Sequence, residues 1–264
     1  MTGLPEPVVT TFAARGFYGD ETVPVSFVEK PGTRDVEPLV VLLHGVHGCA
    51  SPDPDNKYGD LARMIVGAGA KAAIIETSRS RRDRETFGDD REAWAWAAFE
   101  GKTFAMDHSD VLSGLELVSD HAKGGPLWLW GFSLGGLHAA MAAGADTPVI
   151  PELEGLVLSG SGVRIRPEEE KALTLPVLSS SPATETLETA AGSVRARRLV
   201  AFRGDMDETF SQQACRRFVD LAPLDPAAKH FYTIQGADHS FRHQNGQSSR
   251  EPLKKMIEVL PPLL

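Results

Sequence analysis

The pentapeptide Gly131-Phe132-Ser133-Leu134-Gly135 directly follows an apolar run, 127–130, and precedes an Ala- and Gly-rich stretch, 136–143. The run predicts a buried strand and the stretch after it predicts a helix. A serine at a sharp turn between a strand and a helix is typical of a nucleophile elbow, which lifts the hydroxyl above the edge of the sheet. That turn has no room for a Cβ atom two residues before or after the serine, which explains Gly131 and Gly135. The pattern predicts that Ser133 is a nucleophile.

So short a pattern also arises by chance, and its context decides its meaning. The rest of the chain alternates short apolar runs with segments of helical periodicity, which predicts an α/β fold with a mostly parallel sheet and helices on both faces. An N-terminal hairpin, 12–17 with 23–28, is expected as an antiparallel edge. The other expected strands are 39–43, 72–75, 127–130, 153–158, 198–202 and 230–234, and the expected helices are 56–69, 110–121, 136–143, 209–221 and 252–260.

The length of 264 residues and the absence of a linker-like break predict one domain, 1–264. Two segments do not fit a minimal alternation of strands and helices. Residues 77–106 form a long connection, and residues 160–197 are expected to form a short cap insertion. Both should leave the carboxyl ends of strands, where the active sites of α/β proteins lie.

The composition excludes several kinds of partner. Asp and Glu number 36 against 27 Lys and Arg, which gives a net charge of −9 and no basic excess for binding nucleic acid or an anionic membrane. No apolar run approaches the roughly 18 residues that span a bilayer, and residues 1–11 do not resemble a secretory signal. Two cysteines, Cys49 and Cys215, are expected to be free thiols. We therefore expect a cytoplasmic protein.

A serine nucleophile needs a base, and the base needs an acid that orients it. After an elbow the expected chain order is serine, acid, histidine, with the last two each following a later strand. The strand at 198–202 is followed by Asp205 and Asp207, and the strand at 230–234 by His239. Two candidates for the acid therefore remain, and Asp205 could instead be a turn-forming residue.

In order and context, these pieces resemble the α/β-hydrolase fold superfamily. The resemblance covers about residues 23–260 and rests on His44-Gly45, the elbow, Gly204-x-x-Asp207 and Gly236-Ala237-Asp238-His239. The His-Ser-Phe sequence at 239–241 resembles dienelactone-hydrolase-like and acyl-peptidase-like members more than lipases. The resemblance implies Ser133, Asp207 and His239 as the catalytic triad, because the acid in this family stands three residues after the glycine that ends the strand.

An oxyanion hole needs two backbone N–H groups that face the developing charge. The N–H of Leu134 directly follows the serine at the start of a helix, and the resemblance places the second N–H at Val46. No metal is expected, because His44, His47, Asp53 and Asp55 match no standard zinc spacing. No cofactor is expected either. His44 is expected to brace the oxyanion loop, and His47 could face the pocket.

Several other residues have two possible roles. Trp94, Trp96 and Phe99 could line an acyl or aryl pocket or could form local core. The arginines of 79–84 could bind an anion, although a solvated and self-paired face is favoured because acidic residues surround them. Trp128 and Trp130 are expected in the core. His138 and His243 are expected to have no catalytic role, because neither follows a strand as the triad requires.

The expected function is hydrolysis of a carboxylic ester through an acyl-enzyme, with a small or aromatic ester as the leading substrate class. A peptidase, a thioesterase and an acyltransferase could use the same triad. A non-catalytic ligand-binding receptor on the same fold is the alternative of another class, because one fold hosts many functions. The sequence leaves the substrate and the oligomeric state open.

Overall fold

An eight-stranded sheet forms the centre of the computed structural model, which describes residues 6–34, 36–46, 49–122, 124–164 and 175–260. The strand order is β1-β2-β4-β3-β5-β6-β7-β8. Strands β3 to β8 run parallel to one another, whereas β2 runs antiparallel to both of its neighbours, β1 and β4. The strands are β1 Val8–Gly16, β2 Gly19–Glu29, β3 Leu39–Leu43, β4 Lys71–Ile75, β5 Leu127–Phe132, β6 Leu153–Ser159, β7 Ala196–Gly204 and β8 Lys229–Ile234.

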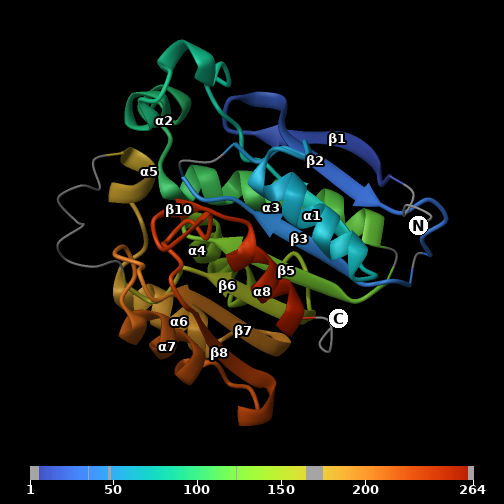
Figure 1. The fold of residues 1–264 in the computed structure, drawn as a ribbon, viewed down its shortest axis with the longest axis vertical. Coiled ribbons are helices and arrows are strands. Elements are labelled where there is room, and N and C mark those ends of the chain that lie inside the picture. The colour runs from blue at the N-terminus through green and yellow to red at the C-terminus, as the bar shows by residue number, and fades with distance from the viewer. Residues whose placement is uncertain (1–5, 35, 47–48, 123, 165–174, 261–264) are drawn as a thin grey trace.

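Helices cover both faces of the sheet (Figure 1). One face packs against α1 and α8, and the other packs against α3, α4, α6 and α7. Alternate residues of β3 serve the two cores, since Val41 faces the second group of helices and Leu42 the first. The helices are α1 Lys57–Gly67, α2 Arg91–Ala98, α3 Phe104–Ala122, α4 Leu134–Ala143, α5 Pro176–Ser179, α6 Thr184–Gly192, α7 Gln212–Leu221 and α8 Glu251–Val259.

The α/β class, the mostly parallel sheet and the antiparallel N-terminal edge are as the sequence predicts. The two long connections contain helices that the sequence analysis did not predict. A 3-10 turn, η1 Arg84–Phe87, and helix α2 lie in 77–106, and helices α5 and α6 lie in 160–197. The two connections touch each other, because the backbone N–H of Phe104 donates to Ser180 Oγ at 2.7 Å. Part of the second connection, with Glu168 to Glu170, lies outside the described residues.

The path of the connection at 77–106 is fixed by a buried ionic network. The Lys102 ammonium is fully buried and lies 2.6 Å from a carboxylate oxygen of Asp107 and 2.6 Å from one of Asp110. It also donates to the carbonyl oxygen of Ser78 at 2.7 Å. Asp110 accepts the backbone N–H of Phe17 at 2.7 Å, which ties the N-terminal hairpin to the same cluster. One lysine therefore joins three segments that are distant in sequence.

The arginine run is not the solvated face that we favoured, as Arg79 shows. Its side chain is fully buried, pairs with Glu76 at 3.0 Å, and lies 4.8 Å from the Trp94 ring and 4.6 Å from the Phe99 ring. Trp94 and Phe99 are therefore local core, and only Trp96 is exposed. Arg81 and Arg82 do follow the expectation, because they lie nearer the surface and pair with Asp83 and Glu76. The error arose because charge spacing in a sequence does not reveal a buried cation–aromatic stack.

Trp128 and Trp130 are buried in the core, as expected. A short hairpin, β9 His243–Gln244 with β10 Gln247–Ser248, follows the main sheet and precedes α8. Among the described residues, no helix combines the length and the apolar character needed to cross a membrane.

Replacing Lys102 by methionine should destabilise the protein by about 3–5 kcal/mol, because Asp107 and Asp110 would stay buried without their counter-charge. Urea denaturation followed by circular dichroism measures the free energy of unfolding. Lys254→Met is the matched control, because Lys254 pairs with Glu251 on the exposed face of α8 and should cost less than about 1 kcal/mol. Equal effects of the two substitutions would contradict the assignment of Lys102 as the centre of the network.

Candidate active site

The turn between β5 and α4 has the geometry of a nucleophile elbow. Ser133 has φ of 52° and ψ of −117°, a conformation that non-glycine residues rarely adopt. A Cβ atom on Gly131 would lie 2.2 Å from the carbonyl oxygen of Gly135, and one on Gly135 would lie 2.5 Å from the carbonyl oxygen of Leu43. Both glycines are therefore required by close backbone approach.

The strained backbone of Ser133 is held from the neighbouring strand. Its N–H donates to the carbonyl oxygen of Ser159 at 2.9 Å, and its own carbonyl oxygen accepts the hydroxyl of Ser161 at 2.7 Å. The same carbonyl accepts the N–H of Gly136 at 2.9 Å at the start of α4. The end of β6 and the first turn of α4 thus fix the direction in which the Ser133 side chain points.

Three side chains from separate strand-end loops form a continuous chain of hydrogen bonds. His239 Nε2 lies 2.9 Å from Ser133 Oγ, and His239 Nδ1 lies 3.0 Å from a carboxylate oxygen of Asp207. The Asp207 side chain is fully buried, whereas the His239 side chain is 26% exposed. The ring of Phe210 stacks on His239, with centroids 5.9 Å apart. A carboxylate that accepts from Nδ1 leaves Nε2 free to take a proton from the serine.

Burial raises the pKa of Asp207, but hydrogen bonds to the carboxylate outweigh it and hold the pKa below its usual value. These bonds come from His239 and from the backbone N–H groups of Phe210 at 2.9 Å and Thr209 at 2.8 Å. Asp207 therefore stays ionised at neutral pH. Gly160, with φ of 58°, leaves the space for this pair, since a Cβ atom there would lie 3.0 Å from His239 Nδ1.

The two candidate acids differ in what their carboxylates contact. Asp207 meets His239, whereas Asp205 accepts the backbone N–H of Gly236 at 2.6 Å and has a turn-forming role. The structure therefore brings together Ser133, Asp207 and His239, and it leaves Asp205 in the loop that supports them.

The loop after β3, whose described part is 44–46, lies against the serine; we call it the oxyanion loop after the role expected for Val46. A Cβ atom on Gly45 would lie 3.3 Å from Ser133 Cβ, which places its neighbour Val46 beside the elbow. Val46 and Leu134 are buried, and within the described part of the chain neither backbone N–H has a hydrogen-bond acceptor. Two unused donors beside a serine are what an oxyanion hole requires. His47, which we considered as a pocket residue, lies outside the described residues.

His44 braces this loop, as expected. Its Nε2 accepts the backbone N–H of Thr77 at 3.1 Å, and its Nδ1 lies 2.9 Å from the carbonyl oxygen of Gly45. Burial, together with the nearby charge of Arg79, lowers the pKa of His44 to about 3, so the ring is neutral at pH 7. Tyr58 Oη accepts the N–H of Gly45 at 2.9 Å and holds the loop from α1.

His138, His243 and Cys215 lie outside this arrangement. His138 pairs with Asp107 at 2.8 Å, and His243 pairs with Asp238 at 3.1 Å. Cys215 is buried, which raises the pKa of its thiol to about 12. Among the described residues, no group of three or more His, Cys, Asp or Glu side chains is arranged to hold a metal ion.

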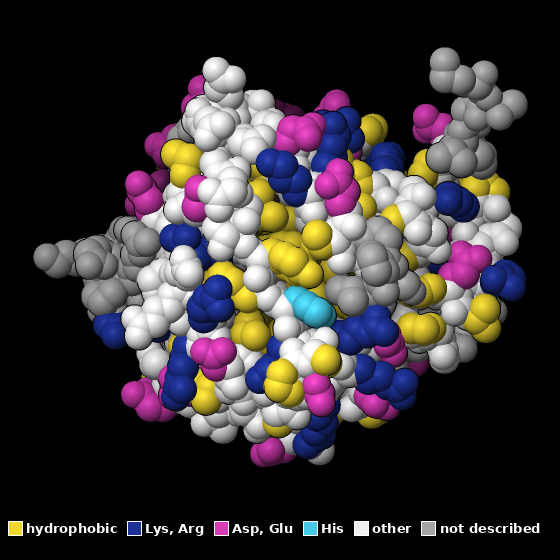
Figure 2. Space-filling model, turned by 60° about the horizontal axis from the view of Figure 1, so that its bottom comes forward, with side chains coloured by type: hydrophobic (Ala, Val, Ile, Leu, Met, Phe, Trp, Pro, Cys, Tyr) yellow, Lys and Arg dark blue, Asp and Glu magenta, His cyan; other side chains and the backbone are white. Residues whose placement is uncertain are grey.

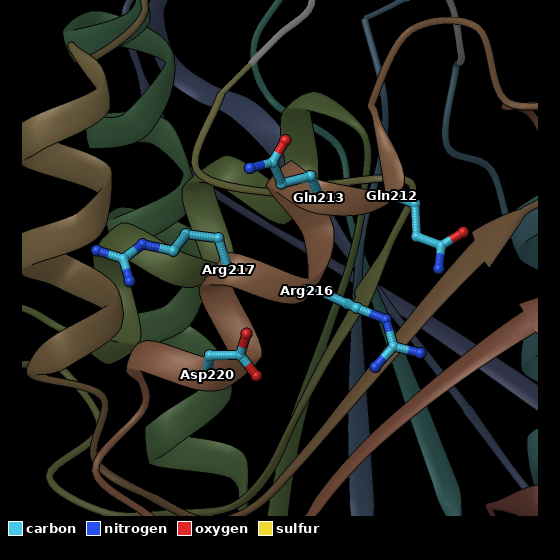
Figure 3. A pocket seen from close by; sticks show the side chains of 5 residues that line it. All are labelled: Gln212, Gln213, Arg216, Arg217 and Asp220. Carbon is cyan, nitrogen blue, oxygen red and sulfur yellow. The ribbon is translucent and has the colours of Figure 1, made fainter.

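The surface mixes charges of both signs, and one depression on it lacks convergent groups. On the face shown in Figure 2, basic and acidic side chains are interspersed around a hydrophobic patch beside a histidine. A depression on α7 is lined by Gln212, Gln213, Arg216, Arg217 and Asp220, whose side chains splay to both sides of the helix (Figure 3). Arg217 is occupied by Glu188 at 2.7 Å. Groups that diverge in this way do not form a reaction centre.

The chain has the α/β serine hydrolase fold. A cold-adapted esterase from an Arctic intertidal metagenomic library superposes with a TM-score of 0.63 at 19% identity, over 97% of this chain and 93% of the esterase. A candidate dienelactone hydrolase from Klebsiella pneumoniae gives 0.66 at 16% identity, over 98% and 99%. A serine hydrolase homologue from Coxiella burnetii gives 0.60 at 18% identity, over 97% of each chain. No protein-family model and no curated protein matches the sequence.

The sequence reading missed the supporting residues of the site. Gly160 and Ser161 directly follow β6, so their place at a strand end was a usable signal. Tyr58 and Arg79 carried no such signal, because their contacts with the His44-Gly45 segment join parts of the chain that only the fold brings together.

Asp207→Asn should lower kcat by a factor on the order of 10³–10⁴, because the amide cannot hold His239 in the tautomer that accepts the serine proton. Turnover of a p-nitrophenyl ester measures the effect. Asp205→Asn is the control and should change kcat only a few-fold, since Asp205 contacts a backbone N–H and not His239. A large loss in the Asp205 variant alone would reverse the assignment.

Proposed function

We propose that the protein is a serine hydrolase that cleaves a carboxylic ester through an acyl-enzyme intermediate. The observation that carries this proposal is the chain of hydrogen bonds from Ser133 through His239 to Asp207, with distances of 2.9 and 3.0 Å. The likeness of the fold to esterases supports the same class of reaction.

In this mechanism Ser133 Oγ attacks the ester carbonyl while His239 Nε2 takes the hydroxyl proton. The resulting imidazolium is stabilised by the Asp207 carboxylate. His239 then returns the proton to the leaving alcohol as the C–O bond breaks, which leaves the acyl group on Ser133. A water molecule, deprotonated by His239, attacks the acyl-enzyme and releases the carboxylic acid, so no external oxidant or cofactor is consumed.

The tetrahedral intermediates place negative charge on the former carbonyl oxygen. We assign its stabilisation to the backbone N–H groups of Val46 and Leu134. Leu134 also begins α4, whose N-terminal end carries partial positive charge, and this favours an oxyanion at the same point.

The substrate class in this proposal is a small or aromatic ester, acted on in the cytoplasm. A peptidase, a thioesterase or an acyltransferase would use the same three residues. A non-catalytic receptor is disfavoured because a receptor does not need a hydrogen-bonded Ser133, His239 and Asp207. The oligomeric state does not enter the mechanism, since all three residues come from one chain.

A fluorophosphonate probe should label one serine per chain, because it reacts with activated serine hydroxyls. Mass spectrometry of the labelled peptide should identify Ser133, and Ser133→Ala should remain unlabelled. Ser161→Ala is a useful comparison, since Ser161 is the neighbouring hydroxyl and should not be the labelled residue. Equal labelling of wild type and Ser133→Ala would remove the basis of the proposed mechanism.

A panel of p-nitrophenyl esters, matched thioesters and anilides separates the rival activities. We expect kcat/KM to be highest for esters of short-chain or aromatic acids. An ester has a better leaving group than an amide, and the proposed mechanism contains no contact that would recognise an amine. Labelling by the probe together with no turnover of any member would favour the transferase or receptor alternatives.

A further inference from the structure

A cavity of about 530 Å³ lies beside the loop that carries His239, and the hydrolase mechanism does not use it. It is formed by the start of α1, the start of α8, the β9–β10 segment and Arg91 at the start of α2. Because α1 follows β3 and α8 follows β8, both helices begin at the carboxyl edge of the sheet, as does the elbow at the end of β5.

The cavity wall is richer in cations than the protein as a whole. Its lining includes four cationic side chains, Lys57, Arg91, Arg242 and Arg250, against two carboxylates. The whole chain carries a net charge of −9. A local excess of positive charge inside a concavity of an acidic protein concentrates anions there.

The carboxylates of the wall do not pair with all of its cationic side chains. Asp60 is paired with Arg250 in a two-pronged ion pair, in which Nε donates to one carboxylate oxygen at 2.7 Å and Nη2 donates to the other. The second carboxylate, Asp55, is exposed. Arg91 is also exposed, and no described residue forms an ion pair with its guanidinium. Its planar fork is therefore available to a ligand that accepts two hydrogen bonds.

Lys57 connects the cavity to the catalytic loop. Its ammonium donates to the carbonyl oxygen of Ser240 at 2.6 Å, next to His239, and lies 3.8 Å from the centre of the Phe132 ring. Burial, followed by the positive charge of Arg242, lowers the pKa of Lys57 well below its ordinary value. The negative charge of Asp238 opposes part of this effect.

Further polar donors complete the wall. Ser248 and Ser249 contribute hydroxyl groups at the point where the β9–β10 hairpin meets α8. The side chain of His243 is held by Asp238 at 3.1 Å, so this ring is oriented by a carboxylate at the rim.

We propose that this cavity is a binding site for a small oxyanion, a phosphate or a carboxylate, held by Arg91 with the seryl hydroxyls. The site is separate from Ser133 and does not depend on the hydrolase activity. The depression on α7 provides a contrast, because its side chains diverge (Figure 3). The Arg216 guanidinium there also lies over the ring of Phe231, 4.6 Å from its centroid.

The test is titration of the full-length protein with inorganic phosphate by isothermal titration calorimetry, at constant ionic strength set with sodium chloride. Constant ionic strength removes non-specific screening from the comparison. We expect saturable binding of one phosphate per chain, and about tenfold weaker binding in Arg91→Gln, because one charge-assisted pair of hydrogen bonds is lost. A second titration with citrate distinguishes the ligands: tighter binding of phosphate identifies a phosphoryl group, and tighter binding of citrate identifies carboxylates.

Matched variants keep the result interpretable. Arg216→Gln removes an equally exposed arginine outside the cavity and should leave the affinity unchanged. Ser133→Ala should bind phosphate as the wild type does, so a failure of the hydrolase proposal would leave this measurement intact. Absence of saturable binding in the wild type, or equal affinity in Arg91→Gln and wild type, would overturn the proposed site.

Discussion

The close approach of the first turn of α4 to the ends of β3 and β5 is the constraint on which the site depends. Ser133 adopts its strained backbone only because Gly131 and Gly135 allow peptide groups to meet without a Cβ atom between them. This conformation is held by the hydrogen bond that the Ser133 N–H donates to the carbonyl oxygen of Ser159, and by the hydroxyl of Ser161, which donates to the Ser133 carbonyl oxygen. Together these contacts fix the direction of the Ser133 hydroxyl group.

The loops after β7 and β8 bring two further side chains to this hydroxyl group. Asp207 and His239 follow β7 and β8, which lie at the far side of the sheet from β3, and they reach the serine because parallel strands end at one edge. Gly160 lies between the serine and these two residues in the strand order, and its missing side chain lets the carboxylate and imidazole meet. Aligned strand ends and one absent side chain therefore assemble groups that are distant in sequence.

The same geometry explains what the sequence could predict. Buried strands such as β3 are continuous apolar runs, and the elbow is a local pattern, so both are readable without the fold. The choice of Asp207 over Asp205 required a resemblance, because two acids in one turn differ only in which way their side chains point. The burial of Arg79 and Lys102 could not be predicted for a further reason. A charged residue is expected to be exposed unless its buried contacts are known, and here these include Trp94 for Arg79 and the carbonyl oxygen of Ser78 for Lys102.

These buried charges change the interpretation of the connection at 77–106. Arg79 packs on Trp94 and Phe99 and lies 3.4 Å from His44, so the connection is attached directly to the oxyanion loop. Lys102 ties the other end of the connection to α3, and through Asp107 to His138 on the elbow helix. The loop that carries His44 and the helix that follows Ser133 thus each contact a buried charged cluster, Arg79 with Glu76 in the first case and Lys102 with Asp107 in the second. In the mechanism that we propose, a substitution in this connection can alter the geometry at Ser133 without contacting a substrate, because a misplaced oxyanion donor would weaken the stabilisation of the transition state.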